Sequence, residues 1–95
     1  MVGLMEISET TSEHLFRVYA FVRDEDGWVT AHDIAAGAKV AERTARAHAL
    51  RLVKAGVFDQ VRAFPGHRYR LAAEKDKSSQ DLVQRLEGMA DVFSV

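Results

Sequence analysis

The side chains of this 95-residue chain that are best suited to chemistry are the basic ones of its central third. Residues 39–70 hold eight basic residues and two acidic ones, a net charge of +6, whereas residues 1–38 carry −5 and residues 71–95 carry −2. The basic residues are Lys39, Arg43, Arg46, Arg51, Lys54, Arg62, Arg68 and Arg70. Such an asymmetry predicts a polyanion or an acidic partner at the central third, the alternative being an ordinary cluster of solvated arginines.

Other kinds of site lack the residues that they need. The four histidines do not stand at a recognised metal-ligand spacing and there is no cysteine, so we expect no metal site and no cofactor. The sequence contains no glycine-rich phosphate loop and no nucleophile elbow, and the acidic run 24–26 lacks the spacing of a calcium loop. We therefore expect a protein that is not an enzyme, and no small-molecule effector is indicated.

Length and composition indicate one small domain. With 95 residues and 47% hydrophobic side chains, the chain can form a single core, but one small enough that a second copy often adds stability. The apolar runs are too short for a membrane span or a signal peptide, and cysteine is absent. We therefore expect a cytoplasmic, nucleoid-associated protein without a membrane partner.

Hydrophobic spacing and capping patterns predict the elements that position the basic residues. Thr10 with Glu13, and Thr30 with Asp33, have the form of capping boxes, and Gly56 has that of a helix-ending glycine. The predicted order is an arm over 1–10, a helix over 11–24, a very short strand at 28–29, a helix over 31–37, a turn at 38–40, a helix over 41–55, a hairpin over 57–71, a linker over 72–78 and a last helix over 79–95, capped by Ser78 or Ser79.

This order, and the residues of 30–35, 40–48 and 52–57, resemble the winged helix-turn-helix modules of MarR-type and IclR-type bacterial regulators. The resemblance covers about residues 13–71, within a predicted DNA-binding domain of 11–71, and implies an α+β fold, mainly helical with a small β-hairpin. It also implies that helix 41–55 enters the major groove of double-stranded DNA, with residues 57–71 as a wing on the flanking backbone. Two positions depart from the family pattern: Lys39 stands where glycine is common, and Ala41 where a capping hydroxyl is common.

Projection of helix 41–55 at 100° per residue predicts which side chains reach DNA. An inward stripe of Ala45, Ala49 and Leu52 places Arg43 and Ala47 on the opposite side. The predicted contacts of the recognition helix and its preceding turn are Lys39, Arg43, Thr44, Arg46, Ala47 and Arg51. Those of the wing are Arg62, His67, Arg68 and Arg70. For Arg43 and Arg46 the alternative is a surface ion pair with an acid such as Glu42, and His48 is interpreted as a helix-packing residue with its hydrogen bonds satisfied.

An apolar stripe in the last predicted helix needs a cover. It consists of Leu82, Leu86, Met89 and Phe93. Either the helix packs back on the first helix or it joins a second subunit, and we expect the second, because a homodimer doubles the contacts of one winged helix on a palindromic site. Leu50 points away from the core stripe and receives no role.

The function predicted from these patterns is that of a small, sequence-specific transcriptional regulator, a repressor that binds double-stranded DNA as a homodimer. Two alternatives share the fold. One is a winged-helix module for protein–protein interaction, and the other is an architectural or recombination accessory protein that binds DNA.

Overall fold

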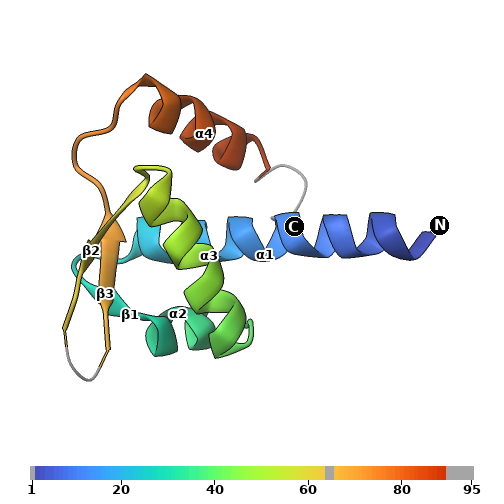
Figure 1. Ribbon diagram of the computed structural model, residues 1–95, viewed down its shortest axis with the longest axis horizontal. Coiled ribbons are helices and arrows are strands. Elements are labelled where there is room, and N and C mark those ends of the chain that lie inside the picture. Colours follow the sequence, from blue (N-terminus) through green and yellow to red (C-terminus); the bar gives the residue numbers. More distant parts are fainter. Residues whose placement is uncertain (1, 64–65, 90–95) are drawn as a thin grey trace.

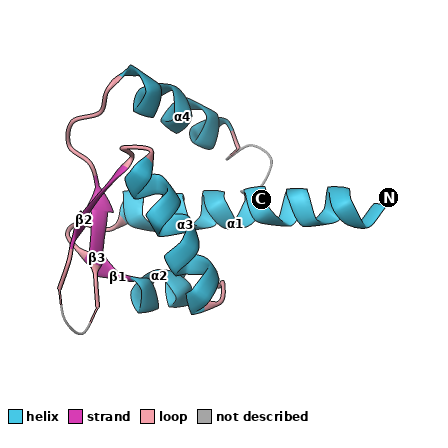
Figure 2. Cartoon of the chain, in the orientation of Figure 1, coloured by secondary structure: helices cyan, strands magenta, loops and turns pink. Residues whose placement is uncertain are grey.

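Four helices and a three-stranded antiparallel sheet make up the described part of the chain (Figure 1, Figure 2). The computed structural model describes residues 2–63 and 66–89, with side chains described from residue 12 onward. In chain order the elements are α1 (Val2–Asp24), β1 (Val29–Thr30), α2 (Ala31–Ala38), α3 (Glu42–Lys54), β2 (Phe58–Val61), β3 (Arg68–Leu71) and α4 (Lys77–Gly88). The predicted fold class is confirmed. None of the described helices is long and apolar enough to cross a membrane.

The first helix is longer than its sequence pattern predicted. It runs from Val2 to Asp24, so the start predicted near residue 11 was wrong, and Thr10 lies within the helix instead of capping it. Leucine, methionine and glutamate before Thr10 favour helix, so a capping pattern alone does not begin one there. Figure 1 shows the N-terminal half of α1 projecting from the body. The other half carries the buried residues Phe16, Val18, Tyr19 and Val22.

α2 begins with a capping box that the sequence predicted and ends in a tight turn that leads to α3. The Thr30 hydroxyl accepts a hydrogen bond from the Asp33 amide at 3.1 Å, and the Asp33 carboxylate accepts one from the Thr30 amide, so the predicted capping box is confirmed. Lys39 ends α2 in the left-handed conformation, with φ of 58°, which explains why glycine suits this position. Ala41 precedes α3 without a side-chain cap.

The sheet has the strand order β1-β3-β2, and its register decides which way the basic residues of the hairpin face. Tyr69 pairs with Val29 on one side and Gln60 on the other, and it is buried under the helices. Arg68 and Arg70 are exposed on the opposite face, as the alternating pattern predicted. The hairpin thus carries an apolar inner face and a basic outer one.

The last helix packs on its own domain at both ends. Asp76, and not the predicted Ser78 or Ser79, is the N-cap, and its carboxylate accepts from the Ser79 amide at 2.8 Å. Ser79 is instead buried and donates its hydroxyl hydrogen to the Ala55 carbonyl at 2.7 Å. At the other end of α4, Glu87 accepts hydrogen bonds from Tyr19 and Arg23 of α1. These bonds tie α4 to α3 and α1.

One residue of the predicted subunit interface, Leu86, packs within its own chain. Leu86 is fully buried in the core of its own chain, so in this arrangement it offers no surface to a second subunit. Leu82 and Met89 are partly buried against the same core, while Phe93 lies outside the described residues. For Leu86 the structure has the other arrangement that the sequence left open, in which the helix packs back on its own domain. Dimerisation remains a prediction.

Candidate nucleic-acid interface

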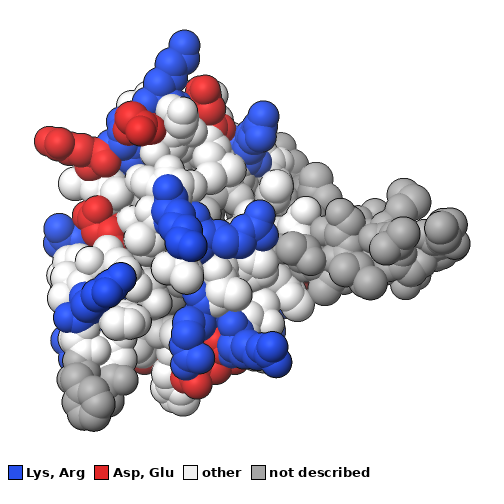
Figure 3. All heavy atoms as spheres, in the orientation of Figure 1, with Lys and Arg blue, Asp and Glu red and all other residues white. Residues whose placement is uncertain are grey.

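The third helix separates an apolar inner face from a basic outer face. Its inner face consists of Ala45, His48, Ala49 and Leu52, all of them buried. The outer face of α3, as we call it below, consists of Arg43, Arg46, Ala47, Leu50, Arg51 and Lys54, all of them exposed. Figure 3 shows Lys and Arg side chains spread across the side of the molecule on which α3 lies. The structure thus brings four predicted contact residues, Arg43, Arg46, Ala47 and Arg51, onto one accessible surface.

The two remaining residues predicted for this region lie at its margin. Lys39 is exposed in the turn before α3, where its left-handed backbone holds it beside the start of the helix. Thr44 is only half-exposed. Thr44 is therefore the least accessible of the six.

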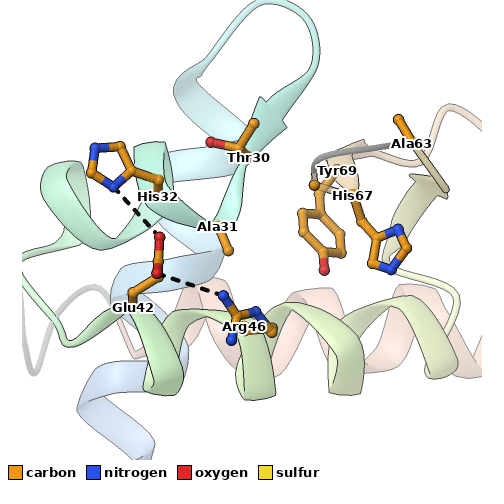
Figure 4. Close-up of a pocket in the computed structure, with 9 residues that line it drawn as sticks. Thr30, Ala31, His32, Glu42, Arg46, Ala63, His67 and Tyr69 are labelled. Carbon is orange, nitrogen blue, oxygen red and sulfur yellow. Dashed lines mark ion pairs between the residues drawn. The ribbon is translucent and has the colours of Figure 1, made fainter.

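Glu42, which the sequence analysis named as an alternative ion-pair partner of Arg43 and Arg46, lies at the start of α3 and pairs with Arg46 (Figure 4). Glu42 lies 3.5 Å from the Arg46 guanidinium and 3.4 Å from Nδ1 of His32. The spacing of four residues between Glu42 and Arg46 was a local signal for the first pair, but His32 comes from α2. All three side chains are largely exposed, so these pairs contribute little to stability. Arg46 keeps 60% of its side chain accessible in this pair.

Arg46 borders a groove between the start of α2, α3 and the hairpin. The groove has a volume of about 730 Å³, and Thr30, His32, Glu42, Arg46, His67 and Tyr69 are among its lining residues. Figure 4 shows His67 and Tyr69 on the side of the hairpin, facing the α3 residues across the gap. The groove therefore joins the outer face of α3 to the hairpin as one continuous surface.

The four basic residues predicted for the hairpin are all exposed but are not equivalent. Arg62, His67 and Arg68 flank the loop and take part in no ion pair among the described residues. Arg70 lies 3.7 Å from the Asp59 carboxylate, and its guanidinium stacks on the Trp28 ring at 4.4 Å. Arg62 follows the end of β2, and Val61 is the residue opposite Arg68 in the strand register. Arg70 is thus the least available of the four.

One histidine, His48, lies in the core and not on the proposed interface. His48 is buried between α3 and α1, as its interpretation as a helix-packing residue predicted. Its Nδ1 atom has no hydrogen-bond partner, so the prediction that its hydrogen bonds are satisfied was wrong for this atom. Burial, reinforced by the positive charge of Arg51 and by His14, lowers the pKa of His48. Among the described residues, no three His, Asp or Glu side chains are grouped to hold a metal ion.

His48 should make the stability of the domain depend on pH. Its pKa is lower in the folded state than the ordinary value near 6.5, so the unfolded chain binds more protons between these two values. The free energy of unfolding should therefore fall as the pH drops below about 6.5. Urea titrations from pH 7.5 to 5 measure this slope. His48→Leu should flatten this slope, and an unchanged slope in that variant would assign the effect to other groups.

Comparison with known proteins shows which fold the chain has. No protein-family model and no curated protein matches this sequence. The crystal structure of ligand-free NadR superposes with a TM-score of 0.52 at 18% sequence identity, covering 96% of this chain and 75% of the NadR chain. The protein has a winged-helix fold. The winged helix accounts for the order of its elements, with α2 and α3 as the helix-turn-helix and β2 and β3 as the wing.

The winged-helix fold also gives the two basic surfaces their relative positions. In a winged helix the second helix of the helix-turn-helix is exposed and the wing extends beside it. Here the outer face of α3 and the loop end of the wing are both basic, and the groove of Figure 4 lies between them. The acidic turn Asp24–Asp26 belongs to the end of α1 and contributes no side chain to this groove. The chemistry of this surface suits a phosphate backbone and base edges.

Proposed function

We propose that this protein is a transcriptional regulator that binds double-stranded DNA in a sequence-specific way. α3 occupies the major groove, and the wing lies on the flanking backbone. The observation that carries the proposal is the outer face of α3, on which Arg43, Arg46, Arg51 and Lys54 are exposed around the small side chain of Ala47. Arginine bonds guanine through two atoms, and alanine permits close approach to a base pair.

Two further observations support this function. The structural neighbour NadR shares the winged-helix fold, and a helix-turn-helix of this kind places its second helix in the major groove of DNA. The net charge of residues 39–70 is +6 although the whole chain carries only −1, so the positive charge is concentrated on the elements that form the proposed interface. A charge of this kind attracts DNA and makes the affinity depend on salt.

Action as a homodimeric repressor in the cytoplasm, associated with the nucleoid, is the finer part of the proposal. Two copies related by a two-fold axis match a palindromic site and double the number of base contacts. Because Leu86 is buried within its own chain, other residues must supply the subunit contact. Sedimentation of the purified protein across micromolar concentrations, with and without DNA, measures the number of subunits.

The experiment that tests the function is selection of preferred sites from random duplex DNA, followed by affinity measurement at several stated salt concentrations. A preferred site bound at least about 1,000-fold more tightly than competitor DNA supports a regulator. Weak and uniform binding supports an architectural or recombination accessory protein instead. An absence of DNA binding at low salt overturns the proposal and leaves a winged helix that binds another protein.

The wing should contribute affinity but little specificity. Arg62→Ala with Arg68→Ala should weaken binding to all sequences about equally and reduce the slope of log K against log salt by about 0.9 for each phosphate that the wing no longer neutralises. Arg70→Ala should change the slope less, because Asp59 and Trp28 already hold its guanidinium. An unchanged slope in a variant that lacks all three arginines would remove the wing from the interface.

A further inference from the structure

Leu50 is a large apolar residue in the middle of the basic outer face of α3. It is 40% exposed, and it belongs neither to the core nor to the partly buried side chains packed against the core. Its intervals to Arg43, Ala47 and Lys54 are seven, three and four residues, which place all four side chains on one stripe of the helix. The core therefore does not explain this leucine.

The two other large hydrophobic residues that are exposed in the described chain have different surroundings. The ring of Trp28 is covered on one face by the Arg70 guanidinium. Val61 lies on the wing, opposite Arg68 in the strand register. Neither belongs to the outer face of α3. Leu50 is thus the one large apolar side chain that this face presents.

The mixture of charge and hydrocarbon on this stripe matches one kind of surface. The major groove offers the acceptor atoms of guanine and adenine together with a single apolar group, the C5-methyl group of thymine. The centre of a protein–protein interface, by contrast, is depleted of charged residues, because buried charges need partners. Arg43 and Lys54 share the stripe of Leu50 and take part in no ion pair among the described residues. A DNA groove can satisfy both the cations and the leucine.

We propose that Leu50 is a specificity-determining residue that packs on the C5-methyl group of a thymine in the recognised site. This inference rests on the proposed function, since it requires α3 in the major groove. Arg43 and Leu50 are seven residues apart on α3, which corresponds to about 10 Å along the helix axis, or about three base-pair steps. Because a helix inclined to the DNA axis spans fewer steps than a parallel one, the thymine lies within about three base pairs of the base that Arg43 contacts.

The test uses the site selected for the full chain and removes one methyl group at a time. Each thymidine is replaced by deoxyuridine, which keeps the base pairing and lacks only the C5-methyl group. Wild-type protein should lose about fourfold in affinity at one thymine, the effect of one buried methyl group. Leu50→Ala should bind the unmodified site more weakly and should be indifferent to deoxyuridine at that same position.

Val83→Ala is the matched control, because Val83 is a partly exposed apolar residue of α4 and lies outside both α3 and the wing. This variant should keep the wild-type response to deoxyuridine, and thermal melting should show all three proteins folded. The inference is overturned if Leu50→Ala keeps the wild-type sensitivity, if no deoxyuridine weakens the wild type, or if Leu50→Ala changes the oligomeric state. In each of these cases DNA binding by wild type persists, whereas failure of the proposed function itself appears as no binding to any duplex.

Discussion

Replacing Arg43 by alanine should weaken binding to the preferred DNA site by about 5- to 150-fold, which corresponds to about 1–3 kcal/mol. Arg43 is exposed in the first turn of α3 and is held by no acidic partner among the described side chains. Its guanidinium is therefore free to bond the edge of a guanine through two hydrogen bonds. The affinity should decrease for the preferred site and stay nearly unchanged for competitor DNA, so the protein should discriminate less well at one base pair.

The control for Arg43→Ala is an exposed arginine away from α3. Arg85 lies exposed on α4, so Arg85→Ala removes the same charge from the protein without touching the proposed interface. Affinities for the selected site, its single-base variants and competitor DNA should be compared at one salt concentration. Equal reductions for both variants would mean that Arg43 acts only through net charge. Wild-type discrimination in Arg43→Ala would remove it from base contact.

Sequence patterns predicted the parts of the fold that depend on local spacing. The stripe of Ala45, Ala49 and Leu52 is buried as projected, because an amphipathic helix has one period whatever it packs against. Gly56 follows α3 with φ of +81°, the conformation that the helix-ending pattern indicated. The alternation in β3 likewise predicted the outward direction of Arg68 and Arg70. Each of these features depends on a few residues that are close together in the sequence.

What the sequence did not reveal depends on residues far apart in the chain. His32 meets Glu42 only because the turn after α2 brings two helices together, and Arg70 stacks on Trp28 only because β1 pairs with β3. The burial of Leu86 has the same origin. Its stripe on α4 indicated that something covers it, but not whether the cover is α1 of the same chain or a second copy.

Leu86→Ala should destabilise the folded chain by about 2–5 kcal/mol, because the substitution opens a cavity beneath α4. Leu86 is fully buried among core residues that include Tyr19 of α1, and the neighbouring Glu87 is bonded to Tyr19 and Arg23. For a domain of this size the melting temperature should fall by about 10 °C or more. Leu82→Ala, at a half-buried position on the same helix, should cost less.

The dependence of the melting temperature on protein concentration distinguishes packing of α4 on its own domain from packing against a second subunit. If α4 packs on its own domain, the difference in melting temperature between wild type and Leu86→Ala stays constant from low to high micromolar protein. If Leu86 instead lies in a subunit interface, wild type gains stability with concentration by mass action and the variant does not, so the difference widens. Sedimentation under the same conditions should then report a wild-type dimer that Leu86→Ala converts to a monomer. That pair of results would contradict the packing described for α4. A constant difference in melting temperature would instead show that the substitution destabilises the core of a single chain.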